Sequence, residues 1–94
     1  MHKQLFEHFI SAPESHIDPS LREKIVKMQD LEPIEASKGI VDVLNMGVRY
    51  SLISDLMVVS IETVAKMLCK VNGLDFDAEV LASAERLEEK DNMM

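Results

Sequence analysis

The sequence predicts an all-α fold, in the form of a small domain of about five helices with a helix-turn-helix-like core, assembled as a dimer. Apolar residues recur at helical spacing along most of the chain, and only 4% of residues are aromatic. The chain has only three glycines and three prolines, an ordinary number for a helical protein and few for an all-β one. Because a chain of 94 residues buries a small core, we expect a homodimer or a higher oligomer.

Proline and aspartate mark the expected helix starts. Asp18 is a suitable N-cap and Pro19 a suitable first residue for a helix over 19–29. Pro33 opens the next helix in the same manner. We expect that helix to stop or kink at Gly47, because glycine weakens a helix.

We expect a single domain over residues 1–94. Gly73 marks the start of its last part, because glycine tolerates the left-handed conformation that ends helices. The expected parts are an N-terminal helix and connector at 1–17, a helix-turn-helix-like core at 33–72 and an acidic C-terminal helix at 73–94.

The stretch 48–72 fits two interpretations. As one continuous helix, it gathers its polar residues within about a third of the circumference and its apolar residues on the opposite side. As two helices, it breaks at 58–60, where consecutive β-branched residues carry a modest helix penalty and Ser60 can cap a new helix. The sequence leaves both interpretations open.

In the two-helix interpretation, the segment has the features of a helix-turn-helix. Val59 would pack the turn into the core, Ser60 would cap the second helix, and Val64 and Leu68 would anchor that helix against the first. Val58 stands where such turns usually have glycine, and positive φ is costly for valine. The residues that we expect to contact DNA, through phosphates or base edges, are Arg49, Ser60, Glu62, Thr63, Lys66 and Lys70.

The net charge of −7 at first argues against a nucleic-acid partner, because phosphate binding depends on Lys and Arg. The acidity is uneven, however. Residues 73–94 contain seven acidic and two basic residues, a net of −5, whereas residues 47–72 contain two acidic and three basic ones, a net of +1. The middle of the chain therefore remains a candidate for DNA binding.

A pattern within this middle segment resembles a known family. A Met-Gly-x-Arg step ends one helix at Gly47 and Arg49, a Val-Ser pair opens the next at Val59 and Ser60, and Gly73 follows the last helix. Over about a third of the chain, this resembles the helix-turn-helix region of the C subunit of the flagellar master transcription activator and related conjugative-transfer activators. The resemblance implies a small DNA-binding transcriptional regulator. The family's cysteine-rich zinc-binding part has no counterpart here, so zinc binding is not implied.

Catalysis and cofactors are not expected. Cys69 is the only cysteine and has no histidine near it in sequence, and the spacing of the three histidines matches no zinc site. The sequence has no glycine-rich phosphate loop and no recognisable nucleophile motif. We therefore expect neither an enzyme nor a metal site.

The rival hypothesis belongs to another class, a protein-binding module. It is an acidic, all-helical, homo-oligomeric adaptor or inhibitor that binds a protein partner, such as another regulatory protein, and has no DNA-binding activity. A lone cysteine and the lack of an apolar leader or membrane span favour a cytoplasmic protein without a membrane partner. The simplest observation that distinguishes the two hypotheses is whether the backbone turns near residues 58–60.

Overall fold

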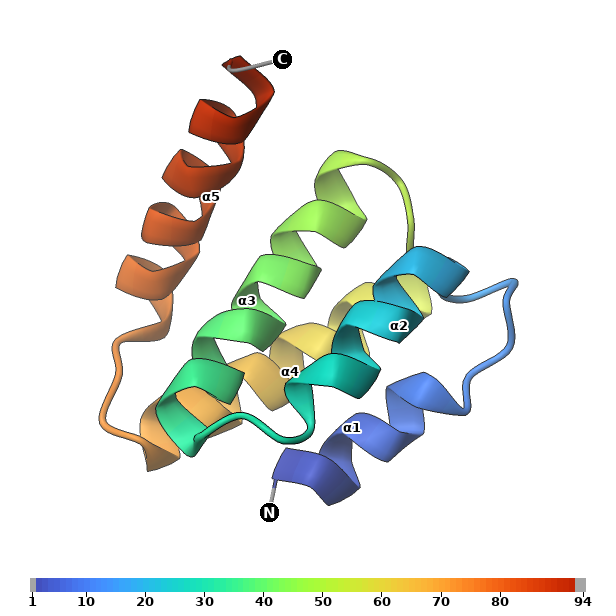
Figure 1. Cartoon of the computed structure of the whole chain (residues 1–94), viewed down its shortest axis with the longest axis horizontal. Coiled ribbons are helices and arrows are strands. Elements are labelled where there is room, and N and C mark those ends of the chain that lie inside the picture. Colours follow the sequence, from blue (N-terminus) through green and yellow to red (C-terminus); the bar gives the residue numbers. More distant parts are fainter. Residues whose placement is uncertain (1, 93–94) are drawn as a thin grey trace.

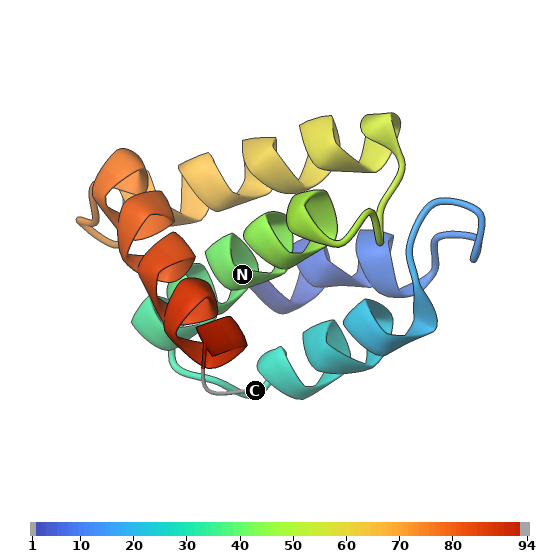
Figure 2. The ribbon, with the colours of Figure 1, turned by 90° about the horizontal axis from the view of Figure 1, so that it is seen from above.

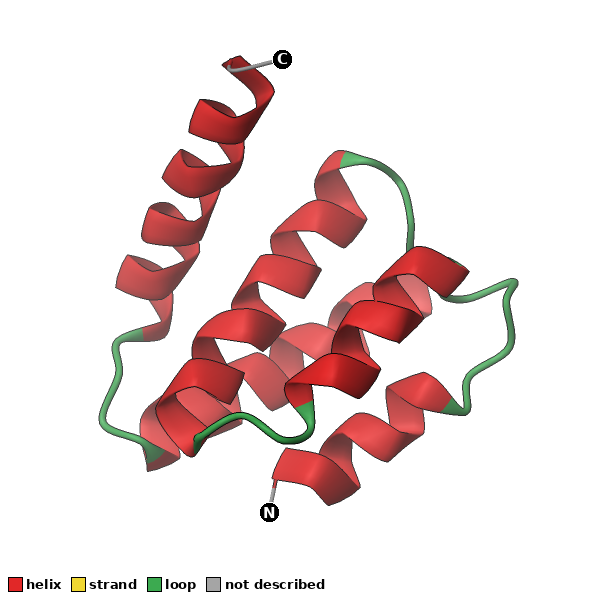
Figure 3. Ribbon diagram, in the orientation of Figure 1, coloured by secondary structure: helices red, strands yellow, loops and turns green. Residues whose placement is uncertain are grey.

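Residues 2–92, the part of the chain that the computed structural model describes, form five helices and no strand (Figure 1; Figure 3). The expected all-α domain of about five helices is therefore confirmed. None of these helices combines the length and the apolar character that crossing a bilayer demands. The helices are α1 (His2–Ile10), α2 (Pro19–Met28), α3 (Pro33–Arg49), α4 (Asp55–Val71) and α5 (Phe76–Asn92).

Helix α3 is the centre of the structure. It packs against α2, α4 and α5, whereas α1 packs mainly against α2 and reaches α4 along one side. Helix α4 runs along one edge of the molecule, so that a whole face of it has no helix beyond it (Figure 2). Phe6 and Phe9 of α1 are the aromatic members of the core, and its other apolar residues are aliphatic or, as Met28, Met57 and Cys69, contain sulfur. Its fully buried members from the other helices include Leu21, Ile25, Ile40, Val41, Val43, Ile61 and Leu68.

The expected starts of α2 and α3 are confirmed. The Asp18 side chain accepts hydrogen bonds from the Ser20 hydroxyl and from the Ser20 amide at 3.0 Å, and Pro19 is the first residue of α2. These two hydrogen bonds lower the pKa of the Asp18 carboxyl. Pro33 begins α3, where its missing amide proton costs no helical hydrogen bond.

Of the expected stop or kink at Gly47, the stop is wrong, because α3 continues to Arg49. Gly47 has a different role. A Cβ at this position would lie 2.6 Å from the Ile53 Cδ1 atom, closer than real contacts allow. Ile53 therefore packs directly on the α3 backbone, and the positive φ that turns the chain occurs at Ser51, with φ 55°.

The turn at 50–54 is fixed by backbone hydrogen bonds to the α1–α2 connector. The Asp18 amide donates to the Leu52 carbonyl at 2.8 Å, and the Ser54 amide donates to the His16 carbonyl at 2.9 Å. His16 Nδ1 also lies 2.9 Å from Ser54 Oγ, which accepts a hydrogen bond from the Met57 amide at 3.2 Å. Ser54 is therefore the N-cap of α4.

Both interpretations of the stretch 48–72 are wrong. The chain does not form one helix over this stretch, because residues 50–54 turn between α3 and α4. It also does not break at 58–60, because α4 is helical from Asp55 to Val71. Ser60 is not an N-cap, because it lies within α4 and its hydroxyl donates to the Leu56 carbonyl at 3.2 Å.

The contact between Gly47 and Ile53 predicts that Gly47→Ala destabilises the fold. The added methyl group would force the Ile53 side chain and the turn to move, at a cost of about 1–3 kcal/mol. Gly39→Ala is the matched control. Its Cβ would lie 3.0 Å from Sδ of the flexible Met28 side chain, and alanine favours a helix by about 1 kcal/mol over glycine. Urea unfolding should therefore show a loss for Gly47→Ala and no comparable loss for Gly39→Ala.

Because Ser54 caps α4 and Ser60 does not, we expect replacement of each serine by alanine to have different effects on stability. Ser54→Ala should lower the free energy of unfolding by about 1 kcal/mol, because the Met57 amide loses its acceptor. Ser60→Ala should leave the free energy of unfolding within about 0.5 kcal/mol, because a half-buried serine within a helix has no capping role. A larger loss at Ser60 than at Ser54 in thermal unfolding would contradict this assignment.

Candidate functional site

One face of α4 is apolar and exposed. Leu56 is 66% exposed, Val59 63%, Met67 40% and Val71 60%, although the opposite side of the same helix already supplies the core. Together with the exposed Thr63, these side chains recur at spacings of three and four residues, so they form one stripe along the helix. We call this stripe the α4 outer face; its members are Leu56, Val59, Thr63, Met67, Lys70 and Val71.

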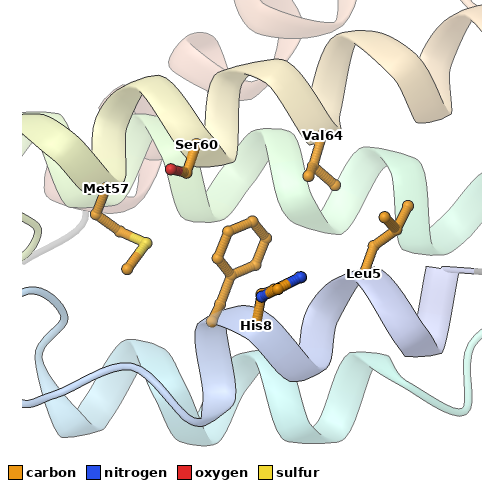
Figure 4. Close-up of a pocket in the computed structure, with 6 residues that line it drawn as sticks. Leu5, His8, Met57, Ser60 and Val64 are labelled. Carbon is orange, nitrogen blue, oxygen red and sulfur yellow. The ribbon is translucent and has the colours of Figure 1, made fainter.

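A shallow groove between α1 and α4 borders the α4 outer face. It has a volume of about 320 Å³. The side chains of Met57, Ser60 and Val64 extend from α4 toward those of Leu5 and His8 on α1 (Figure 4). Phe9 completes the lining. Since Ser60 follows Leu56 by one helical turn, the groove and the outer face are continuous.

Two of the residues expected to contact DNA bond to their own helix. The Ser60 hydroxyl donates to the Leu56 carbonyl at 3.2 Å, and the Thr63 hydroxyl donates to the Val59 carbonyl at 2.8 Å. Such bonds to the preceding turn are ordinary for serine and threonine in helices. The polar groups of these two residues are therefore engaged within α4.

Two further expected residues pair with each other. Glu62 Oε1 and Lys66 Nζ form an ion pair of 2.9 Å across one turn of α4. The Lys66 ammonium also lies 5.5 Å from the centre of the Phe76 ring at the start of α5, within the range of a cation–π contact. These contacts hold the charge of Lys66 on the side of α4 nearest α5.

Arg49 does not belong to the α4 surface. It lies at the end of α3, where its guanidinium is 2.9 Å from the Asp91 carboxylate of α5. The Tyr50 hydroxyl donates to the same carboxylate at 2.7 Å, and this hydrogen bond raises the pKa of Tyr50. Arg49 therefore ties α3 to α5, and the structure does not group it with the expected DNA contacts on α4.

Lys70 is the remaining expected contact, and it lies on the α4 outer face. Within residues 2–92, no ion pair is formed by its ammonium. The structure thus brings five of the six expected residues onto α4 and leaves Lys70 as the cation of the outer face. The net charge of α4 is zero, because Asp55 and Glu62 balance Lys66 and Lys70.

Sequence reasoning did not identify the apolar residues of the outer face. The protein-binding hypothesis expects excess apolar surface on this stretch at Leu52, Val58 and Ile61, but Ile61 is fully buried. The exposed apolar residues of α4 are instead Leu56, Val59, Met67 and Val71. The signal was present, since α4 has more large apolar residues than a helix of its length can bury on one side. That excess predicts a second apolar surface once the helix is known to be continuous.

Cys69 lies on the opposite, buried side of α4. Burial raises the pKa of its thiol, and the carboxylates of Glu79 and Asp75 raise it further. A thiol in this state is a poor nucleophile. Among the described residues, no group of three His, Cys, Asp or Glu side chains is placed to hold a metal ion.

Comparisons with protein-family models, with curated proteins and with solved structures find no match to this chain. The resemblance to the flagellar activator subunit therefore stays a prediction from the residues that carry it.

The environment of Cys69 predicts slow modification. Native protein should react with iodoacetamide at least about a hundredfold more slowly than the urea-unfolded chain, because the reaction requires local opening. Since the folded pKa of the thiol is raised, its contribution to stability is complete below the unfolded pKa and is lost as the pH rises through the folded pKa. Equal rates for native and unfolded protein, measured by mass spectrometry, would contradict the burial.

Proposed function

We propose that this chain is a non-enzymatic protein-interaction module, an acidic helical adaptor or inhibitor that binds a polypeptide through the α4 outer face. The single observation that supports it is the exposure of Leu56, Val59 and Val71, each at 60% or more, on one side of a continuous helix. Apolar side chains aligned in this way are the feature by which helices recognise grooves and other helices.

The physical argument rests on the size and arrangement of the apolar stripe. Exposed apolar residues scattered singly need no explanation, but a contiguous apolar patch marks an interaction site. Burial of apolar surface contributes about 25 cal/mol per Å², so covering Leu56, Val59, Met67 and Val71 would contribute several kcal/mol to association. The α1–α4 groove widens the surface that a partner can cover.

The DNA-binding regulator that the sequence favoured has less support. A DNA-reading helix needs cations for phosphates and free polar groups for base edges. On α4, the hydroxyls of Ser60 and Thr63 bond to the helix backbone, and Lys66 pairs with Glu62. Lys70 alone is a weak basis for nucleic-acid affinity.

Site-specific photo-cross-linking tests the proposal. A photoreactive amino acid in place of Val59 should form adducts with a polypeptide in cells, because this residue is 63% exposed on the outer face. The same amino acid in place of Glu23, on the exposed side of α2, is the matched control and should form far fewer adducts. Mass spectrometry of the adducts identifies polypeptide or nucleic acid.

Two results would overturn the proposal. Polypeptide adducts from Val59 no more frequent than those from Glu23 would show that the outer face is not a protein-binding surface. Adducts with DNA from Val59, together with loss of DNA binding in a Lys66→Glu, Lys70→Glu double variant, would restore the transcriptional regulator.

A further inference from the structure

We infer that the polypeptide on the α4 outer face is a second copy of this chain, packed antiparallel across a two-fold axis at Thr63. The inference rests on the proposed function and names the partner of that same surface. It follows from the order of charges along α4. When a second copy of the helix runs in the opposite direction, its basic residues lie opposite the acidic residues of the first.

The charges of α4 lie along one edge of the outer face. From the start of the helix they are Asp55, Glu62, Lys66 and Lys70, two acids followed by two bases. Reversal of a second helix brings Lys70 of that copy against Asp55. The Glu62–Lys66 ion pair of that copy lies against the same pair of the first copy with its charges reversed, so that each Lys66 would also face the other copy's Glu62 without leaving its own. A two-fold axis repeats each of these pairs, so four attractive contacts would border the interface.

The apolar residues obey the same symmetry. Reversal of the helix sets Leu56 against Val71 and Val59 against Met67 of the second copy, while Thr63 faces itself. The midpoints of these pairs, and of the charged pairs, all fall within about one residue of Thr63. Two parallel helices would instead place each residue beside the same residue of the other copy, so that like charges would be adjacent.

Thr63 suits the crossing point of two helices. Its side chain is short, and its hydroxyl already bonds to the Val59 carbonyl at 2.8 Å, so close contact leaves no polar group without a partner. Helices pack at a shallow angle of about 20° when their side chains interlock along such a stripe. That angle keeps Asp55 and Lys70 of the two copies near each other at the ends.

The groove at the other edge of the outer face would receive the second copy. Met57 and Ser60 line this groove. In the antiparallel arrangement, Met67 of the second copy is opposite Val59 and would reach the groove beside Ser60. Methionine is flexible and fills irregular apolar depressions. The groove therefore adds contact area beyond that of the two helices alone.

The net charge favours this face over α5 for self-association. Each copy carries −7, and the negative charge lies on α5 and on the connectors between helices, where two copies repel each other. The 17 residues of α4 carry two acids and two bases, a net of zero, whereas α5 carries six acids and two bases, a net of −4. Two chains can therefore approach through α4 without that repulsion. With one helix and one groove from each copy, we expect a dissociation constant of roughly micromolar size.

Sedimentation equilibrium of the purified chain tests the dimer. Wild type should move from monomer to dimer with rising concentration, and Val59→Glu should weaken the dimer at least about tenfold, because a charge would be buried at its centre. Leu81→Glu on α5 is the matched control, since Leu81 and Val59 are both 63% exposed. Leu81→Glu should dimerise like wild type, and thermal unfolding should show that both variants fold.

Charge reversal tests the antiparallel direction. Asp55→Lys alone and Lys70→Asp alone should each weaken the dimer about threefold or more at low salt, because each puts two like-charged pairs at the interface. An equimolar mixture of the two variants should form a heterodimer of wild-type strength, and so should the double variant with itself. Both reversals oppose the helix dipole, so a merely structural effect would make the double variant worse than either single one.

Three outcomes would overturn the inference. The first is a wild type that stays monomeric at every concentration, and the second is a dimer that Val59→Glu leaves intact. The third is a dimer that single reversals weaken but the mixture does not restore, which would exclude the antiparallel pairing. A monomeric wild type that still forms Val59 adducts with a different polypeptide would leave the proposed function standing and remove only its partner.

Discussion

The position of the α4 outer face depends on the direct contact of the Ile53 side chain with the backbone at Gly47. Because a glycine occupies that position in α3, the chain can fold back on it, and the turn lies close enough to pair with the α1–α2 connector. That pairing places Ser54 as the N-cap of α4. The register of α4 then determines which side chains face the core and which face outward.

Local sequence signals were sufficient for most of the fold. Asp18-Pro19 and Pro33 predicted the starts of two helices, because an N-cap and a proline at the first helical position act within a few residues. Gly73 predicted the end of α4, and its φ of 72° is the left-handed conformation that this end requires. These signals do not depend on distant parts of the chain.

The turn at 50–54 could not be predicted, because its causes are distant in sequence. Ser51 adopts the positive φ although it is not a glycine, and the turn is held by hydrogen bonds to residues more than 30 positions earlier. The β-branched pair at 58–59 looked like a helix break because its penalty is local, but packing of Met57 and Ile61 into the core overrides a penalty of that size. Without the turn, the register of α4 was open, and so was the identity of its outer face.

The antiparallel bridge between Ile17 and Ile53 also closes the intervening segment into a loop. Helices α2 and α3 form a hairpin whose two ends are joined by backbone hydrogen bonds at Asp18 and Leu52. The short connector between these helices can therefore change in length or composition without moving the point at which α4 begins. Inserted residues there would be tolerated more readily than a single substitution in the bridge, since closing a longer loop adds only a small entropic cost.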